Sequence, residues 1–344
     1  MKYRRTRAVL VIGAACLLGA SLTAVAPAEP APQIRGIGNA PAAETPVHGY
    51  VITKSVPGST IPADYTFVIT RDEVFVAISV RKPAGNGLFP AVLVSSGNGA
   101  GGMRTVERQT ERLASMFDQM IARGYVVAYI EPRNEIPFLY GKQTRAENMP
   151  DSVSGGQRTL KSNPTLDSDD FISAIQYLQS LPYVDKDAVG AMGVSHSGEL
   201  ILKAASEITF ACGVPIEGAA NEYLEVDIGP DAPRKDNEIQ FQDIDVVKRR
   251  ANKAVAMERI KRIRTPLLVI GRDQDHQQGM FKLTYEWLKE AGKDVQWASF
   301  DHPVHGYPFM YRQADGSYKP DAVQQKAFDL YMAYFDKHLK RPRR

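Results

Sequence analysis

Residues 191–199 read Ala-Met-Gly-Val-Ser-His-Ser-Gly-Glu, and the expected architecture follows from this stretch. A short apolar strand is expected to enter it over 186–192. A serine at the tip of a sharp turn between a strand and a helix has a strained backbone, so only small residues fit two positions before and after it. Gly193 and Ser197 meet that demand. Apolar residues then recur at helical spacing: Leu200, Ile201, Ala204 and Ala205. The stretch therefore predicts that Ser195 is a nucleophile between a strand and a helix.

The rest of the chain alternates between strand and helix patterns. Two runs of β-forming residues, at 66–70 and 74–80, predict an antiparallel hairpin. Further strands are expected at 91–94, 125–130, 210–216, 267–270 and 295–300, and helices over 106–121, 171–181, 283–288 and 327–339. Parallel strands need crossover helices between them. The alternation therefore predicts an α/β fold with a mostly parallel central sheet and helices on both faces.

A serine hydroxyl needs a histidine to take its proton and a carboxylate to orient that histidine. In α/β folds that carry such a serine, the chain order is serine, acid, histidine. The predicted base is His305, which precedes Gly306 in the loop after the strand at 295–300. His302, three residues earlier, is the alternative base. The two histidines could also form a metal site, but their spacing supplies no third ligand, so we expect no metal.

The acid is expected just after the strand at 267–270, where Asp273 and Asp275 stand. Counting from the start of the strand favours Asp275, whereas counting back from the end of the next helix favours Asp273. A strand position is usually better fixed than a helix length, so we choose Asp275 and keep Asp273 as the alternative. Glu217, at the end of the preceding strand, is a third candidate.

The negatively charged intermediate of such a reaction needs two N–H donors. One is expected from the backbone of His196, the residue after the nucleophile, and the other from the loop that contains Gly97 and Asn98. Glycine in that loop allows the chain to approach a substrate closely. A phosphate-binding loop at 97–102 is excluded, because no Gly-Lys-Ser/Thr ending is present and the Gly-x-Gly-x-x-Gly register fails.

Residues 1–28 have the pattern of a secretory signal peptide: four basic residues, an apolar run over 8–26 and small residues before Glu29. A membrane anchor is the alternative, since the run is close to the length that spans a bilayer. We expect cleavage, and therefore a periplasmic or secreted protein. The Pro- and Ala-rich residues 29–48 are expected to form a linker.

The remaining residues, 49–344, are expected to form a single domain. Two long stretches between its expected elements, 134–164 and 217–264, are candidate cap segments. Removal of residues 1–28 lowers the formal net charge from +3 to −1, so the charge gives no argument for a nucleic-acid partner. We expect a small-molecule acyl substrate, no cofactor, and no membrane contact after cleavage.

With these motifs in order, the sequence resembles the α/β-hydrolase superfamily, and more narrowly its dienelactone hydrolase and prolyl oligopeptidase-like branch. The resemblance covers most of residues 66–340, and it implies a catalytic triad of Ser195, Asp275 and His305, no metal, and acyl-enzyme chemistry on an ester, thioester or amide. Dienelactone hydrolases proper carry cysteine at the nucleophile, so their substrate does not carry over to Ser195.

Together, the residues and the resemblance predict a secreted serine hydrolase that cleaves a carboxylic ester. A small-peptide or acyl-amino-acid hydrolase of the prolyl oligopeptidase-like type is the alternative within the same chemistry. A non-catalytic binding protein on a hydrolase scaffold is a third possibility, because a fold does not guarantee an activity.

Overall fold

The computed structural model describes residues 51–71, 75–97, 102–132, 166–235, 238–313 and 315–340. These residues all belong to one compact unit that spans Thr45–Arg344. The expected signal peptide at 1–28, the expected linker at 29–48 and the candidate cap segment at 134–164 lie outside the described residues.

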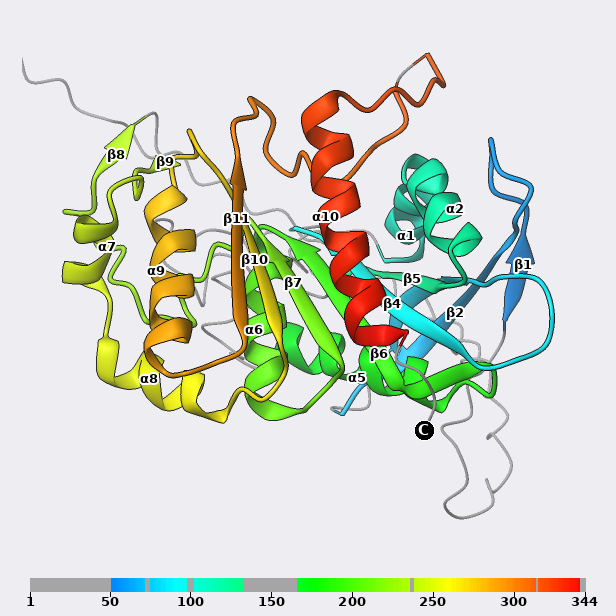
Figure 1. The fold of residues 1–344 in the computed structure, drawn as a ribbon, viewed down its shortest axis with the longest axis horizontal. Coiled ribbons are helices and arrows are strands. Elements are labelled where there is room, and N and C mark those ends of the chain that lie inside the picture. Colours follow the sequence, from blue (N-terminus) through cyan, green and yellow to red (C-terminus); the bar gives the residue numbers. More distant parts are fainter. Residues whose placement is uncertain are drawn as a thin grey trace, which may run out of the picture. The chain divides into compact units, whose positions relative to one another are not determined.

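A mostly parallel sheet runs through this unit. Its strands are β1 (Ile52–Lys54), β2 (Ala63–Ile69), β3 (Phe75–Arg81), β4 (Phe89–Ser96), β5 (Val126–Ile130), β6 (Val184–Val194), β7 (Cys212–Ile216), β10 (Leu267–Arg272) and β11 (Val295–Phe300). Their order in the sheet is β1-β2-β3-β5-β4-β6-β7-β10-β11 (Figure 1). The pairs β1-β2, β2-β3 and β3-β5 are antiparallel. The pairs β5-β4, β4-β6, β6-β7, β7-β10 and β10-β11 are parallel. The predicted hairpin and the predicted parallel sheet are confirmed.

Helices cover both faces of the sheet, as the α/β pattern predicts. They are α1 (Met103–Arg112), α2 (Ala114–Ala122), α5 (Leu166–Ser180), α6 (His196–Glu207), α7 (Ile244–Arg250), α8 (Lys253–Arg262), α9 (Gln278–Glu290) and α10 (Ala322–Leu339). One core contains apolar residues of α5, α6, α8 and α9, and the other contains those of α1, α2 and α10. Successive residues of a strand point to opposite faces. Accordingly, Ala191 of β6 packs in the first core and Met192 in the second.

Two stretches differ from the sequence-based expectation in detail. The single helix expected over 106–121 is two helices, because Leu113 leaves the helical conformation with ψ at 5° while its side chain is fully buried. The stretch 217–264 contains α7, α8 and a small antiparallel pair, β8 (Arg234–Lys235) with β9 (Glu238–Ile239). Residues Ala256 and Ile260 of α8 belong to the core shared with α6 and α9.

The turn at Ser195 has the backbone geometry that its sequence predicts. Ser195 follows β6 with φ at 58° and ψ at −123°, and α6 begins at the next residue. A side chain at Gly193 would bring its Cβ to 2.6 Å from the carbonyl oxygen of Ser197. In the first turn of α6, a Cβ at Gly198 would lie 2.7 Å from the Cα of Gly218, in the chain after β7. The absence of both side chains therefore lets the start of α6 pack directly against backbone.

This close backbone approach predicts that Gly198→Ala destabilises the protein by about 1–3 kcal/mol, because neither backbone can move away without disturbing the sheet edge. Urea unfolding monitored by circular dichroism measures the change. The control is Gly229→Ala, whose Cβ would meet the flexible ends of the Asp227 and Asp231 side chains at 3.1 and 3.3 Å. An unfolding free energy equal to that of the wild type for Gly198→Ala would contradict this account of the turn.

Candidate active site

The residues that the sequence singled out follow four parallel strands. Ser195 comes directly after β6, Glu217 directly after β7, Asp275 three residues after β10, and His305 five residues after β11. The carboxyl ends of parallel strands meet at one edge of a sheet, which is where open α/β sheets bind ligands. All four residues are therefore at the edge where a site is expected.

The loop of His305 reaches the nucleophile turn. A Cβ at Gly306 would lie 3.1 Å from Cγ1 of Val194, the residue before Ser195. On the other side, a Cβ at Gly97 would lie 3.8 Å from the Cβ of Ser195. The loops after β4 and β11 thus both border the serine.

The carboxylate closest to His305 is that of Glu217, the third candidate of the sequence analysis. Oε2 of Glu217 lies 2.6 Å from Nδ1 of His305. Both oxygens of Glu217 also accept the N–H of Gly306, each at 3.1 Å. Oδ2 of Asp275 lies 3.7 Å from the same Nδ1, beyond hydrogen-bond distance. The structure therefore brings two acids to the histidine and gives the direct contact to Glu217.

The carboxylate of Asp275 has other partners at closer range. Its Oδ1 accepts the N–H of Gln277 at 2.7 Å, and its Oδ2 accepts a hydrogen bond from Nη2 of Arg272. Nε of Arg272 lies 3.4 Å from Oε2 of Glu217, and its Nη1 lies 3.4 Å from the carbonyl oxygen of His302. Arg272 therefore joins both acids to the loop that carries the histidine.

Burial and charge differ between the histidine and its acids. The side chain of His305 is 45% exposed, whereas those of Glu217 and Asp275 are 0% and 1% exposed. Burial lowers the pKa of His305, but the carboxylates of Asp275 and Glu217 outweigh it and raise the pKa to about 9. Burial raises the pKa of Asp275, but His305, the Gln277 N–H and Arg272 lower it below its usual value. With its Nδ1 against a buried carboxylate, His305 keeps Nε2 available for another partner.

The alternatives His302 and Asp273 are engaged elsewhere. Nε2 of His302 lies 2.8 Å from Oδ2 of Asp321, the N-cap residue of α10, and the ring stacks on Tyr307 at 4.9 Å between centroids. Asp273 accepts a hydrogen bond from the hydroxyl of Ser299 on β11. The Nε2 that His302 would need as a base is thus taken by Asp321, and no contact between Asp273 and His305 is found among the described residues.

Three residues of the site could also be considered as metal ligands. Donor atoms of Glu217, Asp275 and His305 lie within 4.8 Å of one another. However, the guanidinium of Arg272 contacts both carboxylates, so a positive charge already lies where a cation would bind. A divalent ion would have to displace it or bear its repulsion. The donor set therefore fits a charged hydrogen-bond network better than a metal centre.

The structure describes His196 and Gly97, two of the three residues expected at the oxyanion hole. The N–H of His196 is in the first turn of α6, where a helix provides no acceptor of its own. The N–H of Gly97 donates to the carbonyl of Val194 at 2.9 Å, so this amide holds its loop to the nucleophile turn. Asn98 lies outside the described residues.

A second charged cluster, which sequence reasoning missed, lies around the side chain of His196. Its Nε2 is 2.5 Å from Oδ2 of Asp167 and its Nδ1 is 3.5 Å from Oε2 of Glu199. Burial lowers the pKa of His196, but the two carboxylates outweigh it and raise the pKa to about 9. The available signal was the acidic run Asp167, Asp169 and Asp170 at the start of α5, which does not by itself indicate a partner.

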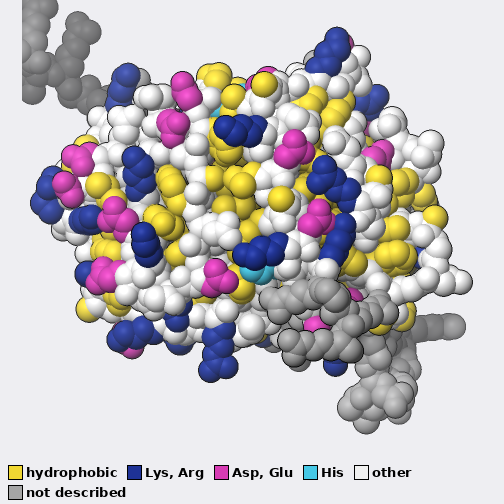
Figure 2. Space-filling view, viewed as in Figure 1, with side chains coloured by type: hydrophobic (Ala, Val, Ile, Leu, Met, Phe, Trp, Pro, Cys, Tyr) yellow, Lys and Arg dark blue, Asp and Glu magenta, His cyan; other side chains and the backbone are white. Residues whose placement is uncertain are grey.

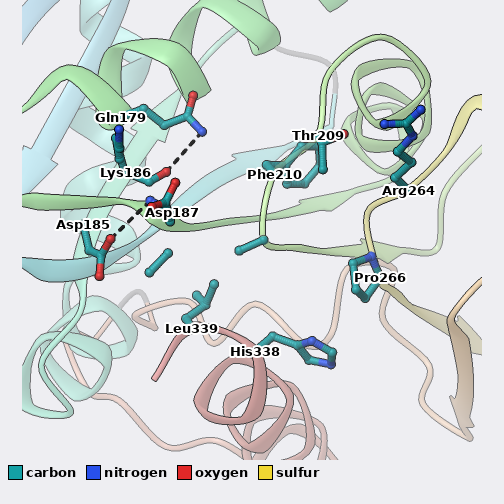
Figure 3. A pocket seen from close by; sticks show the side chains of 12 residues that line it. Gln179, Asp185, Lys186, Asp187, Thr209, Phe210, Arg264, Pro266, His338 and Leu339 are labelled. Carbon is teal, nitrogen blue, oxygen red and sulfur yellow. Dashed lines mark hydrogen bonds between the residues drawn. The ribbon is translucent and has the colours of Figure 1, made fainter. Parts of the chain in front are cut away.

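A separate hollow of about 570 Å³ lies at the opposite end of the strands (Figure 3). It is lined by the first residues of β6, by Arg264 and Pro266 before β10, and by His338 and Leu339 of α10. Nε2 of Gln179 donates to the carbonyl of Lys186 at its rim. Because ligands of open α/β sheets bind at the carboxyl ends of the strands, this hollow is not the candidate active site.

The raised pKa of His196 predicts a pH dependence of stability. A group whose pKa is higher in the folded state stabilises the fold fully below its unfolded pKa, about 6.5, and this contribution is lost as the pH rises through the folded pKa. Wild type should therefore be more stable than His196→Gln at pH 6, by about 1–3 kcal/mol, and the gap should narrow by pH 9.5. Urea unfolding of both proteins measures it. A gap that stays constant over this range would contradict a charged His196.

Comparison with known proteins places the chain in a family. A model described as the prolyl oligopeptidase family matches residues 112–342. A search of curated proteins found no match in sequence.

Solved structures share the fold at low identity. The chain is similar to the acylaminoacyl peptidase of Pyrococcus horikoshii, with 20% identity and a TM-score of 0.53 over 83% of this chain and 43% of that chain. It is similar to a putative dienelactone hydrolase of Klebsiella pneumoniae, with 12% identity and a TM-score of 0.52 over 81% and 100%. The acetyl xylan esterase of a Paenibacillus species matches with 16% identity and a TM-score of 0.55 over 86% and 90%. The chain thus spans less than half the length of the peptidase.

The predicted α/β-hydrolase fold is therefore confirmed, and so is the narrower resemblance. The match to the family model covers about two thirds of the chain, from the end of α1 to beyond α10. The chain belongs to the prolyl oligopeptidase family.

Proposed function

We propose that this protein is a serine hydrolase that cleaves carboxylic esters through an acyl-enzyme on Ser195. The contact between Nδ1 of His305 and the fully buried carboxylate of Glu217, 2.6 Å long, carries the proposal. It gives a half-exposed imidazole a fixed orientation in a loop that borders the serine. Acyl transfer requires an accessible histidine with a buried acid behind it and a nearby serine, and the loop of His305 contacts the strained turn of Ser195.

In this mechanism, Nε2 of His305 takes the proton of Ser195 as Oγ attacks the carbonyl carbon of the ester. The N–H of His196 donates to the oxyanion that forms. His305 then gives the proton to the leaving alcohol, and the acyl group stays on Ser195. His305 then takes a proton from a water molecule as the water attacks the acyl-enzyme, and it returns this proton to Oγ of Ser195 as the bond to the acyl carbon breaks and the acid leaves.

Similarity to solved esterases supports an ester substrate. The matches extend over 90% of the acetyl xylan esterase and 89% of a carboxyl esterase from Tuber melanosporum. The second candidate is a small-peptide or acyl-amino-acid hydrolase, which the family match favours. A non-catalytic role is disfavoured, because a binding protein has no need of strain at Ser195 beside a buried acid and an exposed base.

We also propose export to the periplasm or beyond, on the basis of the signal-like residues 1–28. In the part of the chain that the structure describes, no helix is long and apolar enough to cross a membrane. Figure 2 shows basic and acidic side chains interspersed on one face of the molecule, which supports a small-molecule substrate over a nucleic acid.

The nucleophile is tested with a fluorophosphonate probe on the purified protein. The probe should label Ser195, and Ser195→Ala should lose labelling and lower kcat for a short p-nitrophenyl ester by at least about ten-thousandfold. Ser206→Ala is the matched control, since this serine lies on α6, the helix that follows Ser195, and forms hydrogen bonds with the carbonyl of Leu202 and the hydroxyl of Tyr223. Labelling at another residue, or full esterase activity in Ser195→Ala, would refute the proposal.

The substrate class is tested by comparing kcat/KM for short p-nitrophenyl esters and for aminoacyl or acyl-aminoacyl anilides. Esters are intrinsically easier to cleave, so the comparison should be normalised to the uncatalysed rates of each substrate. An ester hydrolase should show the larger normalised acceleration on esters. A larger normalised acceleration on the anilides would replace the ester proposal with the peptidase alternative.

A further inference from the structure

We propose that Glu217 is the acid that supports His305, and that Asp275 is a positioning residue that acts through Arg272. The inference rests on the proposed function, since a supporting acid has a role only where His305 acts as a base. Chain spacing favours Asp275, the aspartate after β10, as the acid. The side-chain geometry favours Glu217 instead.

The first argument is the geometry at the histidine. Oε2 of Glu217 is 2.6 Å from Nδ1 of His305, a distance typical of a charge-assisted hydrogen bond. The corresponding distance to Asp275 is 3.7 Å, too long for a hydrogen bond. Glu217 also accepts the backbone N–H of Gly306. One carboxylate therefore holds both the ring of the base and the backbone of the next residue.

The second argument is the backbone of Glu217. Its φ is 45°, in the left-handed region that residues with side chains avoid. Among the described non-glycine residues, this feature is shared with Ser195 and Glu225. Its own N–H donates to the carbonyl of Ile270 on the neighbouring strand at 2.7 Å, which fixes the strained conformation. Such strain persists where the surrounding structure enforces it, and it gathers at functional sites.

The carboxylate of Asp275 holds the guanidinium of Arg272. Its two oxygens accept hydrogen bonds from Gln277 and Arg272. Arg272 in turn reaches Glu217 and the carbonyl oxygens of His302 and Pro303. Asp275 therefore fixes the guanidinium, and the guanidinium supports Glu217 and the start of the His305 loop.

The experiment compares Glu217→Gln with Asp275→Asn in the full chain. Glutamine keeps the volume of Glu217 and an oxygen that can accept the Gly306 N–H. Its NH₂ group, however, cannot accept a hydrogen bond from the Nδ1–H of His305. Loss of the carboxylate of a triad lowers kcat on the order of ten-thousandfold, and we expect that loss for Glu217→Gln. For Asp275→Asn we expect a loss on the order of tenfold, the size seen when a supporting partner is removed.

The pH profile separates a catalytic role from a structural one. Among the described residues, the charged groups that face His305 are Glu217 after β7, Arg272 at the end of β10 and Asp275 after it, and His276 lies 3.4 Å from Asp275. Each carboxylate stabilises the protonated imidazole of His305. Removing either one should therefore lower the pKa of His305, so that kcat/KM rises at a lower pH than in the wild type. A variant impaired only by misfolding would keep the wild-type profile at reduced amplitude, and this result for Glu217→Gln would overturn the proposal.

A proton NMR measurement on Asp275→Asn tests the inference even if Glu217→Gln fails to fold. The Nδ1 proton of His305, bonded to Glu217, should give a far-downfield signal that persists in Asp275→Asn and is absent from His305→Ala. Loss of this signal in Asp275→Asn, or a larger kcat loss for Asp275→Asn than for Glu217→Gln, would overturn the assignment. If the wild-type protein neither labels with fluorophosphonate nor cleaves esters, the proposed function fails instead.

Discussion

The register of four neighbouring parallel strands is the constraint on which the site depends. Ser96 of β4 pairs with Val194 of β6, Val194 with Ile216 of β7, and Ile216 with Ile270 of β10. The residue after Val194 is the candidate nucleophile and the residue after Ile216 is Glu217, so both leave the sheet from one row. Backbone hydrogen bonds continue the row beyond the strands: the N–H of Ser195 donates to Ile216, and that of Glu217 to Ile270. Side chains from distant parts of the sequence are thus fixed by backbone pairing.

Buried charge around this row is balanced locally. Transferring an ionised carboxylate out of water is costly unless it finds a partner. Glu217 and Asp275 share Arg272 and His305, whereas Asp167 and Glu199 share His196. One network contains the candidate base, and the other contains the residue after the candidate nucleophile. Removing one partner from either network leaves a buried charge without compensation for its loss of hydration, so these side chains depend on one another.

Local sequence patterns predict the fold well, because alternation and helical spacing report directly which residues are buried. The strand into Ser195, the helix out of it and the histidine in the loop after the last strand all lie where the patterns place them. The choice of acid is different. Spacing tells which residues leave the carboxyl edge, but both Glu217 and Asp275 do so, and only side-chain distances separate them. The pair of Asp167 and His196 joins residues 29 positions apart, and no local pattern predicts such a contact.

Acyl transfer requires that the loops after β6, β7 and β11 bring a serine, an acid and a histidine together. A crystal structure of the purified protein after reaction with a fluorophosphonate would test this arrangement. The account predicts a phosphonyl group on Oγ of Ser195, Nε2 of His305 within hydrogen-bond distance of that group, and Nδ1 still bonded to Glu217. A phosphonyl group on another residue, or an imidazole of His305 turned away from Ser195 in the adduct, would contradict it.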